Sequence, residues 1–366
     1  MCCTAMSNLS RYVDKIKRVM ARFRLRHRLR RCRYVHLMYN DKFTAPFVAF
    51  LNKNFPIDDH IVLCVKMLDF PFPRADNVFE VKRYFKKINL NRPNIEKIIC
   101  HSLFVPEIVE YFYEHPALQR SKACWFIYGG DLYNAPRDEK NDSVRRNFKE
   151  LITDTDGDEQ VAYKKYNTNA PCINAGYSFP VTQQDIDAAK RTEHGYIQIQ
   201  VNNSCDKSTL EILQLLGKFS GKEIRVTTIL SYGDLKYKEP IIACGRQLFG
   251  DNFVPVLEYM TPKRYAEHMA QNDVLIMNQD RQQGLGNEFM ALALGVKLFI
   301  KASVTTHSHF SSRGITVFDT ESLSKIGSIS DLARIPSEVQ TLNKSIVKCF
   351  FDDSYLKAVW QAVFND

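Results

Sequence analysis

Short apolar segments of strand length alternate with segments of helical spacing along most of the chain, and this alternation restricts the fold more than any other feature. In the first half, strands are expected at 34–38, 61–65, 97–101 and 123–128, and helices at 44–54, 78–88 and 106–114. The second half repeats the pattern, with strands expected at 195–201, 223–230, 254–257, 273–277, 297–301 and 315–318. Such repetition is typical of parallel sheets covered by helices. The chain of 366 residues is long enough for two domains of this class.

The domain organisation follows from this pattern and from changes in composition. Residues 137–170 are rich in charge, and we expect a solvated loop there. The two α/β domains are expected to meet near residues 178–194, and the C-terminal stretch has helical patterning. We therefore predict four parts: an N-terminal arm (1–33), a first α/β domain (34–185), a second α/β domain (186–345) and a C-terminal helix (346–366).

The net charge of +9 is concentrated in the N-terminal arm. Residues 1–33 hold eleven Lys and Arg and a single acid, Asp14, which gives the arm a net charge of +10. The other 333 residues carry 39 basic and 40 acidic side chains, a net charge of −1. A body of this charge argues against a protein that coats a nucleic acid.

The arm itself has the pattern of a membrane-surface helix. Apolar residues from Leu9 to Phe23 recur at helical spacing, and Arg and Lys occupy the opposite face. This combination is typical of helices that lie in the interface of an anionic membrane. The residues we assign to that contact are Arg18, Arg22, Phe23 and Arg26. A solvated basic tail and a nucleic-acid-binding arm are the alternatives.

Several classes of protein are disfavoured. The ten cysteines form no C-x-x-C pair, so no zinc site and no other metal site is expected, and reduced thiols in a cytosolic compartment are the simplest interpretation. Asp154–Asp158 is acidic, but an EF-hand starting at Asp154 would need Glu at its twelfth position, where Lys165 stands. No apolar run reaches the length of a transmembrane helix.

Two polar clusters follow predicted strands in the second half. Residues 202–208 (NNSCDKS) lie between a strand and a helix, and residues 281–287 (RQQGLGN) occupy the same position two strands later. Ligands of open α/β sheets bind outside the carboxyl ends of the strands, where backbone N–H groups at helix N-termini suit a phosphate. Neither cluster has the G-x-G-x-x-G or Walker A pattern, which disfavours dinucleotide oxidoreductases and P-loop ATPases. Helix caps and plain turns are the structural alternatives.

Polar residues also follow strands in the first half. Asp131 comes after Gly129-Gly130 at the end of a predicted strand, and a carboxylate there is a candidate general base. Asp41 and His101 follow or end two other strands, and we expect them at the same edge of the sheet. An Asx-turn or a helix cap is the structural alternative for Asp131.

The chain resembles a known family, the bacterial TDP-N-acetylfucosamine:lipid II N-acetylfucosaminyltransferases of enterobacterial common antigen synthesis. The matching pieces are residues 125–133 (WFIYGGDLY), 203–208 (NSCDKS), 258–265 and 281–286 (RQQGLG), together with His36 and His101. Their order and spacing agree over about residues 34–320. The departures are Cys205 in place of an expected Gly, Asn287-Glu288 in place of small or apolar residues, and the preceding arm.

The resemblance implies an α/β protein with a GT-B glycosyltransferase fold, in which two Rossmann-like domains face each other across a cleft. It implies a TDP-sugar donor held by the second domain, a lipid-diphosphate-linked saccharide as acceptor, no bound metal or other cofactor, and a peripheral place on the cytoplasmic face of the bacterial inner membrane. The expected donor-binding residues are Asn203, Ser204, Asp206, Ser208, Tyr232, Glu258, Gln282, Gln283, Gly284, Gly286 and Asn287. The expected catalytic residues are Asp131 as the base, followed by His101 and Asp41.

Other functions stay open at this level. A relative from an O-antigen or capsule cluster would use another nucleotide sugar with the same fold. A protein without catalytic activity, which binds a nucleic acid or a membrane through its basic arm, is the alternative from a different class. We expect the nucleotide-sugar donor, the lipid-linked acceptor and an anionic membrane surface as partners, and no nucleic acid.

Overall fold

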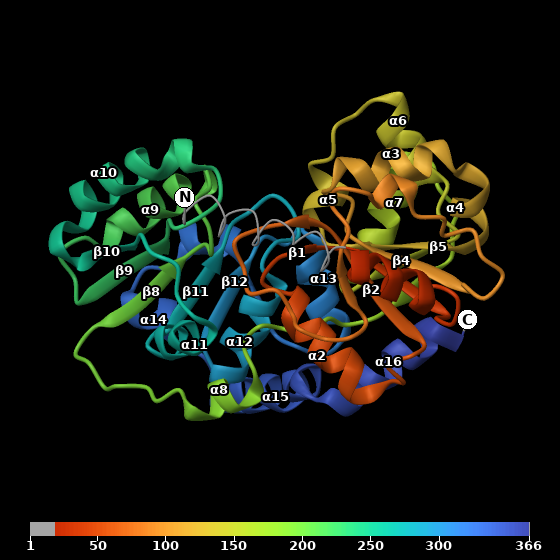
Figure 1. The fold of residues 1–366 in the computed structure, drawn as a ribbon. Helices are drawn as coiled ribbons and strands as arrows, with labels where there is room; N and C mark the ends of the chain where they lie inside the picture. The colour runs from red at the N-terminus through yellow and green to blue at the C-terminus, as the bar shows by residue number, and fades with distance from the viewer. Residues whose placement is uncertain (1–18, 366) are drawn as a thin grey trace, which may run out of the picture. The chain divides into compact units, whose positions relative to one another are not determined.

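The computed structural model describes residues 19–365, which form two compact α/β units (Figure 1). Among these residues, the first unit comprises 19–154, 159–178 and 359–365. The second unit comprises 155–158 and 179–358. Each unit is built on its own parallel sheet.

The first unit contains a seven-stranded sheet in the order β3-β2-β1-β4-β5-β6-β7, in which all neighbouring strands run parallel. Tyr34 in β1 pairs with His60 in β2 and with Lys97 in β4, which sets the register at the centre of the sheet. The strands are β1 (Tyr34–Asn40), β2 (His60–Met67), β3 (Val78–Glu80), β4 (Lys97–His101), β5 (Ala123–Ile127), β6 (Glu150–Thr153) and β7 (Cys172–Asn174).

The helices of the first unit follow these strands along the chain. Two of them, α3 and α4, start with a proline, whose missing N–H costs nothing in the first turn of a helix. The helices are α2 (Thr44–Asn54), α3 (Pro106–Glu114), α4 (Pro116–Lys122), α5 (Gly130–Tyr133), α6 (Glu139–Arg146) and α7 (Asp158–Tyr166), with a short 3₁₀ turn at Phe85–Lys87. The last helix, α16 (Asp353–Asn365), starts in the second unit and ends in the first.

The second unit contains a six-stranded parallel sheet in the order β10-β9-β8-β11-β12-β13. Its strands are β8 (Ile197–Val201), β9 (Ile224–Ile229), β10 (Phe253–Val256), β11 (Val274–Met277), β12 (Lys297–Ile300) and β13 (Phe318–Asp319). All six lie within or near segments that the apolar pattern of the sequence predicts as strands.

Three helices of the second unit, α8, α11 and α14, start with a side-chain cap. Thr261 precedes α11 and its hydroxyl accepts a hydrogen bond from the backbone N–H of Arg264, while Pro262 occupies the first helical position. The helices are α8 (Gln183–Ala188), α9 (Ser208–Leu216), α10 (Lys238–Phe249), α11 (Pro262–Ala270), α12 (Leu285–Leu294), α13 (Thr305–Ser312), α14 (Ile329–Ala333) and α15 (Ser337–Val347). The 3₁₀ segments are Gly217–Phe219, Leu235–Tyr237, Gly250–Asn252, Thr320–Lys325 and Lys348–Phe351.

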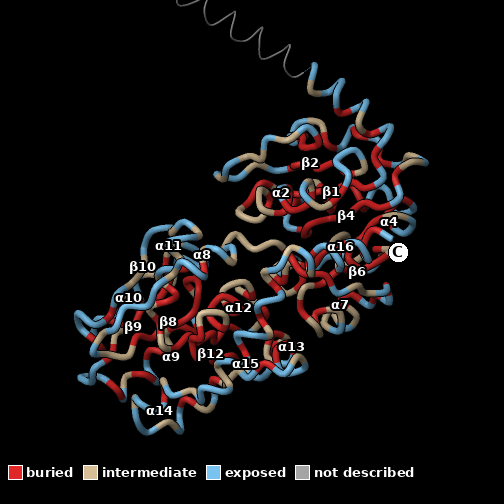
Figure 2. The backbone as a smooth tube through the Cα atoms, turned by 90° about the horizontal axis from the view of Figure 1, so that it is seen from below, coloured by how far each residue is buried: buried red, intermediate tan, exposed pale blue. Residues whose placement is uncertain are grey.

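The strands form the cores of both units, and the outward faces of the helices are exposed (Figure 2). In the first unit the core includes Trp125, and Trp360 of α16 is fully buried there. The indole N–H of Trp360 donates to the carbonyl oxygen of Gly176 over 2.9 Å. This contact anchors the C-terminal helix to the first unit, so the predicted helix at 346–366 is present in part as α16 and has a structural role.

Two local predictions from the sequence are wrong. Residues 78–88, predicted as a helix, contain strand β3 and a 3₁₀ turn, because Val78 and Phe79 pair with β2 at the edge of the sheet. Residues 137–170, predicted as a solvated loop, contain α6, β6 and α7. The sequence does not predict strand β6 because the strand is only four residues long and begins with Glu150. The carboxylate of Glu150 is buried, with its Oε2 atom 2.9 Å from Nζ of Lys97.

The unit boundaries differ from the boundaries expected from the sequence. The chain passes from the first unit to the second at residues 178–179, so that the whole of α8, which the expected boundary after residue 185 would divide, belongs to the second. Ile186 of α8 packs in the core of that unit. The described part of the basic arm belongs to the first unit, because Leu25, Leu29 and Cys32 are buried in its core.

Candidate functional site

The second unit has its topological switch point between β8 and β11. The chain builds β8, adds β9 and β10 on one side, and then crosses to place β11 on the other side. Ligands of open α/β sheets bind outside the carboxyl ends of the strands at such a point. Both polar clusters predicted from the sequence follow these two strands, since residues 202–208 follow β8 and residues 278–287 follow β11.

These two loops are joined by three hydrogen bonds. The backbone N–H of Asn278 donates to Oδ1 of Asn202 over 2.8 Å, and Nε2 of Gln279 donates to Oδ1 of Asn203 over 3.2 Å. Farther along, Nε2 of Gln283 donates to Oγ of Ser204 over 2.6 Å. The structure thus brings together the predicted residues Asn203, Ser204 and Gln283.

Gly284 allows the loops to approach so closely. It precedes α12 in the left-handed conformation, with φ of +79°, which is costly for a residue with a side chain. A Cβ atom at this position would lie 1.9 Å from Nδ2 of Asn203, which is much closer than two non-bonded atoms can approach. The N-terminus of α12 follows immediately, and the backbone N–H groups of a first helical turn favour an anion.

Asp206 and Ser208 organise the loop after β8. Oδ1 of Asp206 accepts from the backbone N–H of Ser208 over 2.8 Å and from its hydroxyl over 2.6 Å. Nδ2 of Asn202 donates to the same hydroxyl and to Oγ1 of Thr209. These two predicted donor-binding residues therefore fix the start of α9.

The remaining predicted residues of the second unit follow other strands or lie at the start of α12. Tyr232 follows β9, and its carbonyl oxygen accepts from the backbone N–H of Cys205 over 2.8 Å. Gly286 and Asn287 lie in the first turn of α12. Glu258 follows β10, two strands away from the switch point, and is exposed. No hydrogen bond within residues 19–365 brings Glu258 to the loops after β8 and β11.

Two buried oxygen atoms near Gly284 have no hydrogen-bond partner within the described chain. One is Oε1 of Gln282, a residue predicted for this site, and the other is Oε2 of Glu288 in the first turns of α12. Glu288 is only 1% exposed, and burial raises the pKa of its carboxyl to about 8. Sequence reasoning missed Glu288 as a site residue. The signal that could have found it is an acidic residue directly before the apolar segment 289–294, because acidic side chains are rarely buried without a partner.

Replacement of Glu288 by Gln is expected to stabilise the protein at high pH. The folded-state pKa of about 8 lies above the ordinary value of 4.5, so the folded state retains a proton that the unfolded state has lost, and stability falls as pH rises from 4.5 to 8. The loss of stability above pH 8 is about 5 kcal/mol, at about 1.4 kcal/mol per pH unit. Urea unfolding at pH 5, 7 and 9 measures it.

In that experiment, E288Q should equal the wild type at pH 5 and exceed it by several kcal/mol in unfolding free energy at pH 9. The matched control is Glu267→Gln, which changes an exposed carboxyl on α11. A difference between E288Q and the wild type that does not vary with pH contradicts the buried, protonated carboxyl.

The first unit has an equivalent switch point between β1 and β4. Asp41 follows β1, His101 ends β4, and Asp131 lies in α5 directly after β5. The three candidate catalytic residues therefore occupy the ends of central strands, as predicted. Their local environments differ.

Asp41 shapes the turn before α2 with one of its oxygens. Oδ1 accepts from the backbone N–H groups of Phe43 (2.9 Å) and Thr44 (3.2 Å) and from the hydroxyl of Thr44 (3.1 Å). These three contacts all use Oδ1, and the hydroxyl of Tyr39 also forms a hydrogen bond with this carboxylate. Burial raises the pKa of Asp41, against the effect of these hydrogen bonds.

Both carboxylate oxygens of Asp131 are occupied. Oδ2 accepts from the backbone N–H of Leu103 over 2.9 Å and from the indole N–H of Trp125 over 2.7 Å, and Oδ1 accepts from the backbone N–H of Tyr128 over 2.9 Å. The side chain is 1% exposed. Burial raises the pKa of Asp131, while the three donors and the nearby Arg145 oppose that rise. These contacts match the structural alternative for Asp131, in which the residue holds a turn together.

His101 belongs to a buried row of three imidazoles. Its Nε2 lies 2.9 Å from Nδ1 of His36, whose Nε2 lies 3.2 Å from Nδ1 of His60. Burial lowers the pKa of His101 and that of His60 to about 3, so both rings are neutral at neutral pH. Nδ1 of His101 is buried and has no hydrogen-bond partner within residues 19–365.

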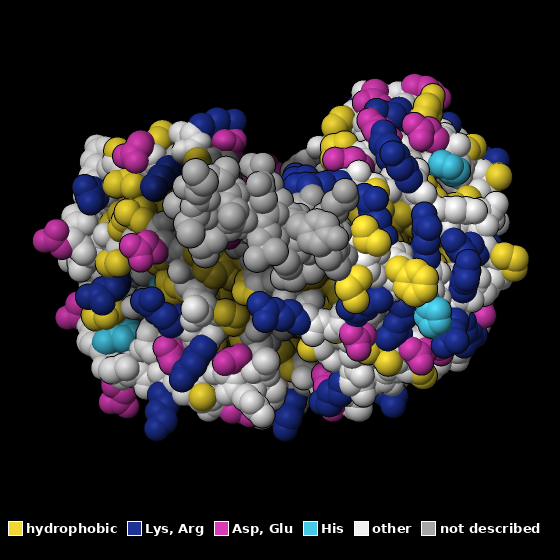
Figure 3. Space-filling model, in the orientation of Figure 1, with side chains coloured by type: hydrophobic (Ala, Val, Ile, Leu, Met, Phe, Trp, Pro, Cys, Tyr) yellow, Lys and Arg dark blue, Asp and Glu magenta, His cyan; other side chains and the backbone are white. Residues whose placement is uncertain are grey.

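The predicted membrane residues lie in the first unit or before it. Arg18 lies outside the described residues. Phe23 is 73% exposed and Arg26 is exposed, while the guanidinium of Arg22 lies over the ring of Tyr84, 4.7 Å from its centroid. On the face shown in Figure 3, Lys and Arg side chains are numerous on the first unit.

Within residues 19–365, no helix has the length and apolar character needed to cross a bilayer. No group of three or more His, Cys, Asp and Glu side chains is arranged there to hold a metal ion. The eight cysteines in the described range are all free thiols.

Solved structures resemble this chain over most of its length. The α,α-trehalose-6-phosphate synthase of Burkholderia multivorans matches with a TM-score of 0.65 and 11% identity, over 91% of this chain and 98% of that one. The sucrose-phosphate synthase of Thermosynechococcus elongatus gives the same values. WaaG, a glycosyltransferase involved in lipopolysaccharide biosynthesis, matches with a TM-score of 0.56 and 11% identity, over 91% and 98% of the two chains. At these identities the likeness concerns the fold.

Sequence comparison adds the family. No curated protein matches this chain by sequence. The model of the family described as "4-alpha-L-fucosyltransferase glycosyl transferase group 56" matches residues 89–366, more than half of the chain. This match confirms the resemblance that the sequence motifs indicate. The chain therefore belongs to glycosyl transferase group 56 and is a glycosyltransferase with a GT-B fold.

Proposed function

We propose that this glycosyltransferase transfers an N-acetylfucosamine-like deoxyamino sugar from a TDP-sugar to a lipid-diphosphate-linked saccharide during bacterial surface polysaccharide synthesis. The single observation that carries the proposal is the junction of the loops after β8 and β11 around Gly284, next to the N-terminus of α12. The family description names a fucosyltransferase, and the motifs at residues 203–208 and 281–286 resemble those of N-acetylfucosaminyltransferases.

The donor diphosphate would lie against the N-termini of α9 and α12. Both helices start in the two joined loops, and partial positive charge at helix N-termini stabilises the negative charge that develops on a departing nucleoside diphosphate. Oε1 of Gln282 and the protonated carboxyl of Glu288 would then bind donor hydroxyl groups, because each has unused hydrogen-bonding capacity. Glu258 and Tyr232, at the ends of the outer strands, would contact the remainder of the donor.

The acceptor would bind to the first unit, with Asp41 as the general base. Asp41 and Asp131 both have a raised pKa, but Asp131 uses both oxygens to hold its turn, whereas the turn contacts of Asp41 use Oδ1 alone and its other side-chain contact is with the hydroxyl of Tyr39. A carboxylate of raised pKa is better matched to proton abstraction near neutral pH. The capping contacts of Oδ1 would hold Oδ2 in a fixed direction. We assign Asp131 a positioning role, because its contacts connect the strand ends of β4 and β5.

A transfer assay tests the substrates. The purified chain is incubated with a lipid-diphosphate-linked disaccharide and with TDP-N-acetylfucosamine, or with UDP-, GDP- or ADP-sugars in parallel, and the lipid product is analysed by mass spectrometry. The proposal predicts a mass increase of one N-acetylated deoxyamino sugar with the TDP donor. Transfer from another nucleotide sugar alone would favour an O-antigen or capsule transferase.

The proposal includes a peripheral position on the cytoplasmic face of the bacterial inner membrane. Residues 19–28 are helical and expose Val19, Met20 and Phe23 by 60% or more each. Arg26, Arg30 and Arg31 are exposed and form no ion pair with residues of the described chain. An anionic bilayer surface binds segments that combine exposed apolar side chains with unpaired basic side chains.

We expect the full chain to float with vesicles that contain phosphatidylglycerol and to remain behind with pure phosphatidylcholine. A double substitution, Met20→Ser with Phe23→Ser, should lower vesicle binding at least about tenfold, because each buried apolar side chain contributes roughly 1.5–3 kcal/mol. Point substitutions are preferable to truncation at residue 34, which would remove Leu25 and Leu29 from the core. The control is Tyr113→Ser on α3, another exposed apolar residue. Equal flotation of the double variant and the control would refute this position.

A further inference from the structure

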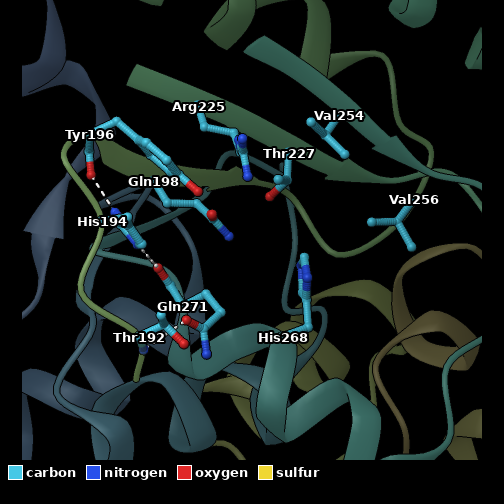
Figure 4. Close-up of a pocket in the computed structure, with 10 residues that line it drawn as sticks. All are labelled: Thr192, His194, Tyr196, Gln198, Arg225, Thr227, Val254, Val256, His268 and Gln271. Carbon is cyan, nitrogen blue, oxygen red and sulfur yellow. Dashed lines mark hydrogen bonds between the residues drawn. The ribbon is translucent and has the colours of Figure 1, made fainter. Parts of the chain in front are cut away.

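The second unit contains a cavity of about 330 Å³ that is separate from the loops after β8 and β11 (Figure 4). Residues of the segment before β8, of three neighbouring strands and of α11 line it: Thr192, His194, Tyr196, Gln198, Arg225, Thr227, Val254, Val256, His268 and Gln271. Tyr196 and Gln198 lie at the amino end of β8, whereas the candidate donor site lies beyond its carboxyl end. The cavity has no part in the proposed transfer.

Arg225 is the only side chain with a fixed charge in this lining, which contains no acidic residue. It extends from β9 into the cavity beside Gln198 and Thr227 (Figure 4). Its guanidinium carbon lies 4.4 Å from the ring centroid of Tyr196. The ring of Tyr196 also stacks on that of His194, with 4.1 Å between the two ring centroids. This stack holds the guanidinium in one position.

Apart from its contact with the ring of Tyr196, the guanidinium forms no hydrogen bond and no ion pair within residues 19–365. Its Nε atom is buried and without a hydrogen bond, and Arg225 forms no ion pair there. Arg225 is half-buried, but its Nε–H group is buried, and buried polar groups are normally hydrogen-bonded. A rigid fork of N–H groups that points into a cavity and lacks a counter-ion is suited to a carboxylate or a phosphate.

The cavity wall formed by α11 contributes a neutral hydrogen-bond acceptor, His268, and β10 contributes apolar surface. Nε2 of His268, on α11, lies 3.1 Å from Oε1 of Gln200. Nε2 of Gln200 donates to Tyr265 and to the carbonyl oxygen of Asn202, which leaves Oε1 as the acceptor and Nε2 of His268 as the donor. Burial lowers the pKa of His268, so the ring is neutral and its Nδ1 atom can accept. Val254 and Val256 cover the remaining side.

We propose that this cavity is a second ligand site, which binds a small hydroxylated oxyanion, such as a sugar phosphate or a hydroxy acid, through Arg225. The oxyanion pairs with the guanidinium, a hydroxyl group donates to His268, and the carbon skeleton packs on the two valines. The volume lies at the lower end of the range for small-molecule sites, which excludes an intact nucleotide sugar. The site does not depend on the identity of the transferred sugar.

Titration calorimetry with glucose 6-phosphate, malate and inorganic phosphate tests the site in the full-length protein. At least one probe should bind the wild type, and Arg225→Gln should weaken it at least about tenfold, as expected when charge-assisted hydrogen bonds are lost. Arg246→Gln, which removes an exposed Arg of α10, is the matched control and should bind like the wild type. The phosphate and carboxylate probes distinguish the two sources of the anion. Absence of binding by all three probes, or equal binding by R225Q, overturns the proposal.

A second variant guards against a folding defect in R225Q. Val254→Trp keeps Arg225 but fills the cavity from β10, an edge strand where residue 254 is 40% exposed. It should also lose the probe, while the binding of TDP stays unchanged in both variants. Wild-type probe affinity in V254W would place the ligand elsewhere and overturn the proposal. Absence of TDP binding by the wild type would instead count against the proposed TDP donor, so the two proposals fail separately.

Discussion

Replacement of Gly284 by Ala is expected to lower the affinity for the nucleotide donor by about 100-fold, which is the order of effect that a 1 Å displacement in a preorganised site produces. The added Cβ would stand 1.9 Å from Nδ2 of Asn203, so Asn203 must move away. Its Oδ1 atom would then lose the hydrogen bond from Gln279, which joins the two loops. TDP binding, measured by thermal shift and calorimetry, should fall with the fold retained.

Gly221→Ala is the control for this experiment. Gly221 has a similar backbone conformation, with φ of +74°, but a Cβ atom there would meet nothing within 4 Å. The left-handed conformation costs both variants roughly 1–2 kcal/mol, and only G284A adds the clash with Asn203. Equal TDP affinity in G284A and G221A would contradict the role of the joined loops.

Replacement of Asp131 by Asn should destabilise the protein, by about 3–5 kcal/mol, the usual cost of removing one member of a buried charged network. The amide NH₂ of Asn would face at least one of the three N–H donors that Asp131 now accepts from. Arg145, which is also buried, would lose its nearby negative charge. Thermal unfolding should show a fall of roughly 5 °C in Tm.

Asp41→Asn is the informative partner of D131N. An amide oxygen can replace Oδ1 of Asp41 toward Phe43 and Thr44, and Asn is as good as Asp before a helix. D41N should therefore keep the wild-type Tm and lose transfer by about 100-fold or more, the range for a general base. If D131N folds normally yet has no activity, and D41N is active, the base is Asp131 and our assignment of the two carboxylates is reversed.

Most of the fold could be predicted because parallel strands that are buried on both faces tend to have continuous apolar sequences. Strands β2, β5, β11 and β12 are largely of this kind, whereas β8 (IQIQV) and β9 (IRVTTI) contain polar residues between the apolar ones. Strand β6 is different, because its first residue is Glu150 and only the distant Lys97 makes the burial of that carboxylate possible. The short edge strands β3 and β7 depend on pairing with a neighbour, which the local sequence does not contain.

The site was predictable to the extent that polar residues after strands mark the carboxyl edge of a parallel sheet. This rule found Asn203, Ser204, Gln283 and Gly284, and the strand order then shows why they meet. It could not show that both oxygens of Asp131 are occupied, because two of the donors, Leu103 and Trp125, come from other parts of the fold. The cavity at Arg225 was missed for a related reason, since its lining residues alternate with core residues along β9 and β10.

Hydrogen–deuterium exchange of the full chain with and without TDP tests the central claim most directly, because it locates the nucleotide without assuming a mechanism. We predict slower exchange in residues 202–208 and 278–288, and loss of that protection in G284A but not in G221A. Protection confined to other segments, such as 192–198 and 254–271 around the second cavity, or no protection in the presence of saturating TDP, would contradict the assignment of the donor site to the switch point between β8 and β11.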